Sequence, residues 1–458
     1  MAAAGREFFT VRTVAEALRS FRPAHRTGVE TVALADALRR VPAADLRCAE
    51  PLPAFDRSAV DGYAVQARDT HGASDAIPSF LRVIGEVRMG SPAPGPLAPA
   101  TAIAIPTGGA LPEGADAVVM VEHTQPAVEG FIEVVRAVAP GDGVVRAGED
   151  AGAGEVVARA GRPLRAQEIA LLAACGITEV SAHARPRVAI IATGDEIVAP
   201  QTATLGPGQV RDALSDSVAA LVREAGGIPQ PWGIVRDDPG LLREALAAVL
   251  DDQRDGAGAL PGDVAGTLPG DGAGAPSGDG AGAPPGDSAL PAPGAGQRTA
   301  GPADAVVVCA GSSVGARDGT ATAIASVAEL WCHGLAIKPG KPTLLADAGG
   351  VPIIGLPGNP RSALVVFRLI GMDLIRQVGG VTEPIIRPSV VRRLSRDLPS
   401  AAGRLDVVQV RLRGELAEPL FGPSALLSVM TAADGWLIVE EDANGLAAGE
   451  QVEVFLDG

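Results

Sequence analysis

The middle of the chain alternates between apolar runs and segments with helical spacing. Residues 187–193, 305–309 and 351–356 read RVAIIAT, AVVVC and VPIIGL, and such continuous runs are typical of strands buried on both faces. A shorter strand is predicted at 231–235. Helices are predicted at 217–225, 241–250, 320–331 and from Ser362 onward. This series predicts a mainly parallel sheet covered by helices.

Two other regions have a different pattern. Residues 50–145 are rich in Val, Pro and Gly and show little helical period, which indicates a β-rich module. Residues 385–458 contain short alternating runs such as VVQVRLRGEL and EQVEVFL, which predict a small β domain. The fold class is therefore multidomain α/β plus β.

Residues 254–302 form a low-complexity insert between a predicted helix and the next strand. The insert is dominated by Gly, Ala and Pro, and it repeats the dipeptide Gly-Asp. With few large apolar side chains to bury, it is predicted to be disordered. A role in binding calcium or a partner is the alternative.

Composition narrows the range of functions. A chain of 458 residues allows two to four domains, and its net charge of −16 argues against nucleic-acid binding and adhesion to anionic membranes. Neither a secretory signal nor an apolar stretch long enough to span a membrane is recognised. Four scattered cysteines, Cys48, Cys175, Cys309 and Cys332, lack metal-ligand spacing. We expect a reduced, cytoplasmic compartment.

Candidate chemistry lies at the predicted strand ends. In parallel sheets, ligands bind beyond the carboxyl ends of the strands, and here each strand runs into a small-residue loop that carries a polar side chain. Lys338 and Lys341 are the only lysines among 38 basic residues. Two explanations are open for lysine at these two positions. One is chance in an Arg-biased genome, and the other is a need for a compact ammonium that faces an oxyanion.

Three further motifs are weak when taken singly. Residues 51–65 read PLPAFDRSAVDGYAV, and the pair Asp61-Gly62 fits either a plain hairpin turn or a site. Residues 106–122 read PTGGALPEGADAVVMVE, with a Gly-rich start that suits an anion or a simple turn. Residues 147–157, AGEDAGAGEVV, form a similar acidic loop.

Taken together and in order, these stretches resemble the MoeA family of molybdopterin molybdenumtransferases, which includes the E domain of gephyrin. The resemblance covers nearly the whole chain apart from the insert. Its motifs are PLPAFDRSAVDGYAV, TGGALPEGADAVVMVE, GEDAGAGEVV, ATGDEIV, IVRDDP, SVGARDGT, KPGKP and GLPGNPRSA.

The resemblance implies four domains. A MogA/MoaB-like α/β domain would comprise residues 1–25 and 182–385, and a small linking domain 26–48 and 148–181. A β-rich domain would cover 49–147, and a C-terminal domain resembling a β-barrel 386–458.

The resemblance also implies an activity. The family inserts molybdate into adenylylated molybdopterin with Mg²⁺, cleaving the phosphoanhydride and releasing AMP and molybdenum cofactor. The expected form is a homodimer with the site at the subunit interface. Expected protein partners are a molybdopterin adenylyltransferase and molybdoenzyme apoproteins.

Family positions map onto named residues here. Asp61, Glu196, Asp237 and Asp318 are the candidate catalytic residues, and the last three are also candidate Mg²⁺ ligands. The alternative for each carboxylate is a helix cap or turn residue. The candidate substrate-binding residues are Thr107, Asp150, Ser313, Gly315, Lys338, Lys341, Pro357, Gly358 and Asn359.

Several positions depart from the family pattern. A family lysine corresponds to Gly334, an arginine to Gln409, a serine to Pro423 and an asparagine to Leu214. Most of these changes remove a donor or charge that would face an anion, while the acidic set is intact. Ser312, His333 and Ser424 stand close to the lost groups in sequence and offer compensation.

Two alternatives to the enzyme therefore stay open. One is a weakly active or non-catalytic paralogue that binds pterin or acts as a dimeric scaffold. The other is a transferase that uses tungstate in place of molybdate. The sequence does not separate the two, because both anions are tetrahedral and of nearly equal size.

Overall fold

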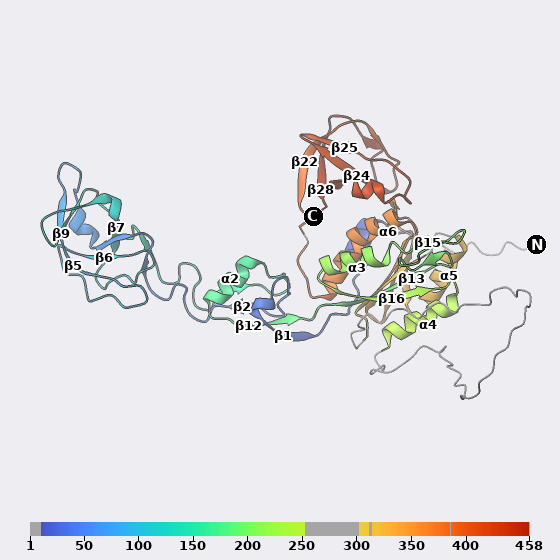
Figure 1. Ribbon diagram of the computed structural model, residues 1–458, viewed down its shortest axis with the longest axis horizontal. Helices are drawn as coiled ribbons and strands as arrows, with labels where there is room; N and C mark the ends of the chain where they lie inside the picture. Colours follow the sequence, from blue (N-terminus) through green and yellow to red (C-terminus); the bar gives the residue numbers. More distant parts are fainter. Residues whose placement is uncertain (1–10, 252–301, 311–313, 385, 458) are drawn as a thin grey trace, which may run out of the picture. The chain divides into compact units, whose positions relative to one another are not determined.

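The protein was analysed as a computed structural model, which describes residues 11–251, 302–310, 314–384 and 386–457 (Figure 1). The predicted disorder of 254–302 falls almost wholly outside these residues. The chain divides into two compact units. The first unit comprises Met1–Gly28 and His183–Gly458, and the second unit comprises Val29–Ala182. No helix of the described residues is long and apolar enough to cross a membrane.

A six-stranded sheet forms the centre of the first unit. Its strand order is β16-β13-β17-β21-β20-β18. The first four strands are mutually parallel, and β20 is antiparallel to both of its neighbours, β21 and β18. This agrees with the predicted, mainly parallel sheet. The strands are β16 (Ile228–Val235), β13 (Arg187–Thr193), β17 (Ala305–Cys309), β21 (Val351–Leu356), β20 (Leu344–Ala348) and β18 (Glu329–His333).

Helices cover both faces of this sheet (Figure 1). Both faces are apolar because side chains alternate along each strand. In β17, Val307 packs in the core on one face and Val306 packs in the core on the other. Helices α1 (Val14–Ser20), α3 (Ser215–Glu224), α6 (Pro360–Val366) and α7 (Met372–Val378) pack on the first face, with a π-helical turn at Phe367–Gly371. Helices α4 (Pro239–Leu250) and α5 (Val314–Ala325) lie on the second. A small strand pair, β14 (Ile197–Val198) with β15 (Val210–Arg211), follows β13.

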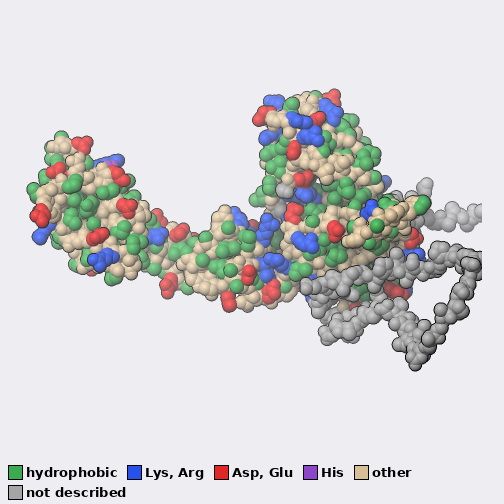
Figure 2. All heavy atoms as spheres, in the orientation of Figure 1, with side chains coloured by type: hydrophobic (Ala, Val, Ile, Leu, Met, Phe, Trp, Pro, Cys, Tyr) green, Lys and Arg blue, Asp and Glu red, His purple; other side chains and the backbone are tan. Residues whose placement is uncertain are grey.

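The C-terminal strands close into a five-stranded barrel in the order β24-β25-β22-β28-β26, with β26 pairing back to β24. The strands are β22 (Ser389–Leu394), β24 (Leu405–Arg413), β25 (Leu416–Pro419), β26 (Gly435–Val439) and β28 (Gln451–Leu456). Smaller elements are β23 (Leu398–Pro399), β27 (Gly445–Leu446) and α8 (Ser428–Thr431). The barrel is anchored on the α/β core because Val407 and Trp436 join the cluster around Val307. Charged side chains of both signs are interspersed on its visible face (Figure 2).

The second unit contains a six-stranded sheet in the order β7-β4-β6-β5-β9-β8. Its strands are β4 (Gly62–Val65), β5 (Ser79–Glu86), β6 (Thr101–Ile105), β7 (Ala117–Met120), β8 (Thr124–Pro126) and β9 (Phe131–Val134), with 3₁₀ turns at Ala67–Thr70 and Val121–His123. The rest of the unit has a separate core that includes Val32, Leu164 and Leu172. That part holds α2 (Ala166–Ala174), a 3₁₀ turn at Leu34–Asp36, and the strand pairs β1 (Val29–Ala33) with β12 (Glu179–His183) and β2 (Leu46–Arg47) with β11 (Val156–Ala158). The short pair β3 (Arg57–Ser58) and β10 (Val144–Val145) completes the unit.

Candidate functional site

The loops that follow β13 and β16 meet at the carboxyl edge of the parallel sheet. Thr193 ends β13 and donates a hydrogen bond of 3.0 Å from its hydroxyl to Oδ1 of Asp237, which lies just beyond β16. The backbone N–H of Asp237 in turn lies 3.4 Å from Oδ1 of Asp195. The adjacency of strands in the sheet thus brings the TGDE loop and the predicted Asp237 together.

Glu196 lies in the same TGDE loop and is half-buried. Its backbone carbonyl accepts a hydrogen bond of 2.8 Å from Val210. Its carboxylate folds back over Gly194, where a Cβ atom would lie 2.9 Å from Oε2 of Glu196. Gly194 also has φ of +153°, a conformation that L side chains rarely adopt. A glycine at this position therefore lets the acidic side chain approach the strand end.

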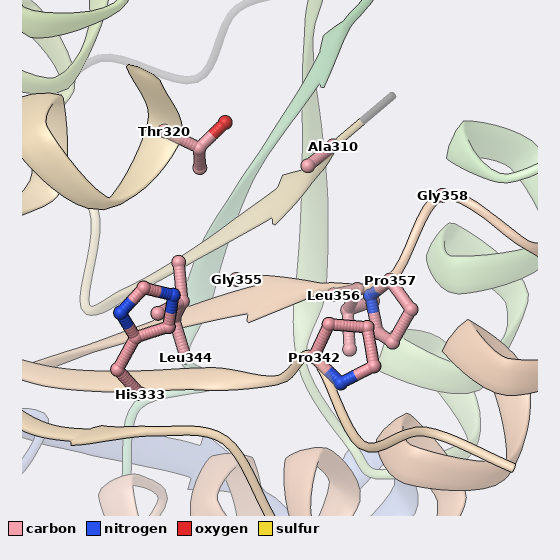
Figure 3. Close-up of a pocket in the computed structure, with 9 residues that line it drawn as sticks. All are labelled: Ala310, Thr320, His333, Pro342, Leu344, Gly355, Leu356, Pro357 and Gly358. Atoms are coloured by element: carbon pink, nitrogen blue, oxygen red, sulfur yellow. The ribbon is translucent and has the colours of Figure 1, made fainter. Parts of the chain in front are cut away.

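A hollow opens at the ends of β17 and β21 (Figure 3). It is a small hollow with a cavity volume of about 10 Å³, which is room for about one water molecule. Its lining includes two predicted residues, Pro357 and Gly358, together with Ala310, Thr320 and His333. Figure 3 shows Thr320 on α5 facing the ends of these strands. Asn359, also predicted, is the N-cap residue of α6.

The first turns of α5 carry Gly315 and Asp318, two of the predicted site residues. Ser313 and the possible compensating residue Ser312 lie outside the described residues. Among the residues that the structure does describe, no group of three or more His, Cys, Asp or Glu side chains is arranged to hold a metal ion.

Lys338 lies on β19 (Ile337–Lys338), a two-residue strand that pairs in parallel with the barrel strand β24. Its ammonium is 3.8 Å from Oδ2 of Asp406, and its side chain is 60% exposed. Asp406 also accepts a hydrogen bond of 3.0 Å from Nε of Arg404. The predicted Lys341 is exposed, three residues further along the chain. Asp406 was not predicted, because it is distant from Lys338 in sequence.

Two of the departures from the family pattern have structural explanations. Leu214 is the N-cap residue of α3 and is buried in the apolar core, with 7% of its surface exposed. Gly334 follows β18 with φ of +121°, a region that favours glycine over every L side chain. A polar side chain at 214 would therefore have to enter an apolar core, and a lysine at 334 would have to adopt a backbone conformation that favours glycine.

Gln409 is buried on β24 and accepts a hydrogen bond of 2.6 Å from Nε of Arg361. The same guanidinium donates from Nη1 to the carbonyl of Gly422 at 2.9 Å. Pro423 and Ser424 follow in this loop, and the carbonyl of Ser424 accepts a hydrogen bond from the backbone of Arg361. Arg361 was not predicted, although an arginine directly after the GLPGNP motif was a visible signal.

In the second unit, Asp61 and Thr107 lie together as predicted site residues. Oδ1 of Asp61 accepts hydrogen bonds from the backbone N–H of Thr107 at 2.7 Å and from its hydroxyl at 3.1 Å. These two donors, the backbone N–H first, lower the pKa of Asp61. Gly62 begins β4, and a Cβ atom there would lie 1.9 Å from the carbonyl oxygen of Val119. Asp61 is therefore held at a tightly packed strand end.

Asp150 is exposed on another loop of the second unit, and its backbone N–H donates to the carbonyl of Leu52 at 3.0 Å. Behind this loop, the thiols of Cys48 and Cys175 lie 2.8 Å apart in the core around Leu172. Burial, followed by the neighbouring Cys48, raises the pKa of Cys175 to about 11. The thiol of Cys175 is therefore protonated at neutral pH.

Comparisons with known proteins agree with this architecture. Residues 12–176 match the MoeA N-terminal region (domain I and II), and residues 391–456 match the MoeA C-terminal region (domain IV). Residues 189–256 and 294–377 match a probable molybdopterin binding domain. The gap between these last two ranges falls within the low-complexity insert.

Relatives and solved structures extend the match over nearly the whole chain. Molybdopterin molybdenumtransferase 2 of Mycobacterium tuberculosis is 32% identical over 453 residues, covering 97% of each chain. Molybdopterin molybdenumtransferase of Bacillus subtilis is 29% identical and covers 93% of this chain and 89% of its own. A crystal structure of the molybdopterin biosynthesis MoeA protein from Pyrococcus horikoshii OT3 superimposes with a TM-score of 0.75 at 28% identity, covering 98% of this chain and 100% of that one. The chain belongs to the MoeA family.

Proposed function

We propose that the protein inserts molybdate into adenylylated molybdopterin, cleaving the phosphoanhydride and releasing AMP and molybdenum cofactor. The observation that carries this proposal is the end-to-end match to a molybdopterin molybdenumtransferase, with 97% of both chains aligned. The molybdopterin-binding region matches the part of the chain that contains the TGDE loop and Asp237. Shared architecture and shared motifs therefore support the same chemistry.

The acidic residues of the first unit are assigned to metal binding and to positioning water. Carboxylates are hard oxygen donors, and Mg²⁺ takes one or two of them together with waters and substrate phosphates. We assign Glu196, Asp237 and Asp318 to such a partial ligand set, in which waters and substrate phosphates would supply the remaining oxygens. Bound Mg²⁺ would offset the negative charge of the phosphate oxygens.

A second group of residues is assigned to the binding of the substrates. Lys338 projects a largely exposed ammonium from β19, suited to a phosphate or to molybdate. Pro357, Gly358 and Asn359 form the loop beside the hollow, where they would orient the pterin. Ser313, Gly315 and Lys341 are assigned supporting contacts to the substrate.

The second unit is assigned the remaining part of the site. Asp61 is kept ionised by Thr107, which suits a carboxylate that must stay charged in use. We assign Asp61, Thr107 and Asp150 to a site completed by a second copy of the chain, in a cytoplasmic homodimer. The proposed four domains are supported by separate apolar cores around Val32, Val65, Val307 and Val410. An adenylyltransferase would supply the substrate, and a molybdoenzyme apoprotein would accept the product.

The direct test supplies purified protein with adenylylated molybdopterin, Mg²⁺ and molybdate. We expect AMP release that depends on molybdate, measured by chromatography, together with cofactor formation measured by reconstitution of an apo-molybdoenzyme. Arg376→Lys serves as a control variant that should keep the wild-type activity. Arg376 forms an ion pair with Asp373 within α7, and neither residue is assigned to the site. A parallel reaction with tungstate decides which anion is used.

A pterin-binding scaffold without turnover is the second candidate. It is favoured by one group of observations, namely that Gly334, Gln409 and Pro423 stand where the family carries a lysine, an arginine and a serine. Tight binding of adenylylated molybdopterin by a folded protein, without AMP release under any anion, would establish this alternative and remove the first.

A further inference from the structure

Arg361 is a buried cation without an acidic partner among the described residues. It lies in the first turn of α6, where α6 packs against the barrel (Figure 1), and only 7% of its surface is exposed. Its guanidinium donates to Gln409 Oε1 and to the carbonyl of Gly422, which are both neutral acceptors. Arginine stays charged in proteins even when burial lowers its pKa, as it does here. A positive charge is therefore fixed at this point with nothing described to neutralise it.

One end of this guanidinium is open. Nη2 makes no hydrogen bond to any described residue, and it is absent from the fully enclosed polar atoms that lack a partner. Within the described residues, Nη2 is therefore the end of the guanidinium that is free to take a further acceptor. Buried charges in folded proteins are normally paired, because desolvation without a counter-ion is unfavourable. A guanidinium that is clamped on two sides and open on the third is suited to an external anion.

Gln409 fixes the direction of this open end. It is 2% exposed and lies on the same face of β24 as Val407, which packs against the α/β core. By the resemblance described above, position 409 carries an arginine in the family. Here the neutral amide accepts from Nε of Arg361, so a positive charge is present in this region but is supplied by α6 instead of by β24.

Arg361 is also connected to the loops of the candidate site. The ion pairs of Asp406 with Arg404 and Lys338 lie at the start of the same strand as Gln409, although Asp406 is on the opposite face of that strand. The loop that accepts the Nη1 hydrogen bond of Arg361 continues through Pro423 to Ser424, whose carbonyl accepts from the Arg361 backbone. Arg361 also follows Gly358, which lines the hollow, by three residues. The cation therefore adjoins the loop that we assign to the substrate.

We propose that Arg361 binds a tetrahedral oxyanion of the substrates, and that Gln409 is the positioning residue that holds its guanidinium. The inference rests on the proposed function for the identity of that oxyanion, which is either a phosphate of adenylylated molybdopterin or molybdate. It goes beyond that function by assigning the anion contact and its support to Arg361 and Gln409, neither of which is among the candidate site residues named above.

The decisive variant is Gln409→Glu, because it distinguishes an anion-binding role of Arg361 from a purely structural one. A carboxylate at 409 would pair with the guanidinium and neutralise it, so the melting temperature should be unchanged or higher. The dissociation constant for the bound oxyanion should nevertheless rise by roughly tenfold or more, the effect expected for losing one charged hydrogen-bond donor. Gln409→Leu, which removes the support without adding charge, should give a smaller rise.

Arg361→Lys and Arg361→Gln complete the set, with Arg376→Lys as the control for loss of a partly buried arginine. Two probes are used with every variant: pyrophosphate, measured by thermal shift and calorimetry, and adenylylated molybdopterin, measured by calorimetry without molybdate. The apparent KM for molybdate is measured separately. Weakened binding of adenylylated molybdopterin identifies the phosphate, and a raised molybdate KM alone identifies molybdate.

The outcomes separate this inference from the proposed function. If the wild type shows no turnover but binds pyrophosphate in a way that Gln409→Glu weakens, the function fails and the anion site stands. If turnover is normal, and all Arg361 and Gln409 variants bind both probes and molybdate as the wild type does, the inference is overturned and the function stands. Loss of melting temperature in the Arg361 variants, with unchanged affinity in the folded fraction, would make Arg361 only a latch between α6 and the barrel.

Discussion

The hydroxyl of Thr193 donates a hydrogen bond of 3.0 Å to Oδ1 of Asp237. The two residues are 44 positions apart, and they meet because β13 and β16 are parallel neighbours whose carboxyl ends share one edge of the sheet. This bond fixes Oδ1 of Asp237, while Oδ2 accepts no hydrogen bond from the residues that the structure describes. The acidic loops at this edge thus act as one oriented group.

Loss of these carboxylates should abolish turnover without unfolding the protein. We expect Glu196→Ala and Asp237→Asn to eliminate AMP release, while the melting temperature changes little because these loop side chains contribute little packing. Thr193→Val should reduce the rate less, since the carboxylate stays but loses its orientation. A large drop in melting temperature in both carboxylate variants would mean that these residues are structural.

The carboxylate of Asp61 should set the acid side of the pH profile. Thr107 lowers the pKa of Asp61, so the ionised form persists to lower pH than for an ordinary aspartate and is lost as the pH falls through that lowered value. Thr107→Val removes the hydroxyl donor but keeps the backbone N–H. The acid limb of the pH–rate profile should therefore move to higher pH in this variant and disappear in Asp61→Asn together with activity. An unmoved acid limb in Thr107→Val would assign that ionisation to another group.

Restoring the family lysine at position 334 should not restore function by itself. Gly334 has φ of +121°, so any L side chain there strains the backbone by about 1–3 kcal/mol. We expect Gly334→Lys and Gly334→Ala to lower the melting temperature by similar amounts, with no gain in AMP release from the lysine. A lysine variant that is both more active and as stable as the wild type would contradict the strain argument.

Deletion of residues 256–300 should leave stability and activity near those of the wild type. The flanks of the insert are already held together, because the backbone N–H of Ala303 donates to the carbonyl of Val249 at 2.9 Å. A short connection therefore closes the gap at little entropic cost. Sedimentation and the AMP assay check this prediction, and loss of the dimer upon deletion would assign the insert a role in assembly.

Sequence patterns predicted the main sheet because its central strands are continuous apolar runs. They failed at its edges. The strand β16 begins at Ile228, earlier than the predicted 231–235, because it continues through Pro229, a residue that an edge strand tolerates. The prediction of one helix over 320–331 was wrong in its second half. There α5 ends at Ala325 and the edge strand β18 starts at Glu329, in a segment whose apolar spacing fits either structure.

Motifs located the acidic loops of the site, but contacts between distant segments could not be predicted from the sequence. Asp406 reaches Lys338 only because β19 pairs with β24. Arg361 and Gln409 are 48 positions apart and belong to different layers of the first unit. Leu214 was interpreted as a lost polar residue, whereas it contributes to the apolar core.

The most direct test of the proposed function is AMP release from adenylylated molybdopterin by the wild-type protein, with Mg²⁺ present and molybdate as the variable. We expect AMP to appear only when molybdate is added, together with active cofactor. A folded protein that binds the substrate tightly but releases no AMP at any concentration of molybdate would contradict it.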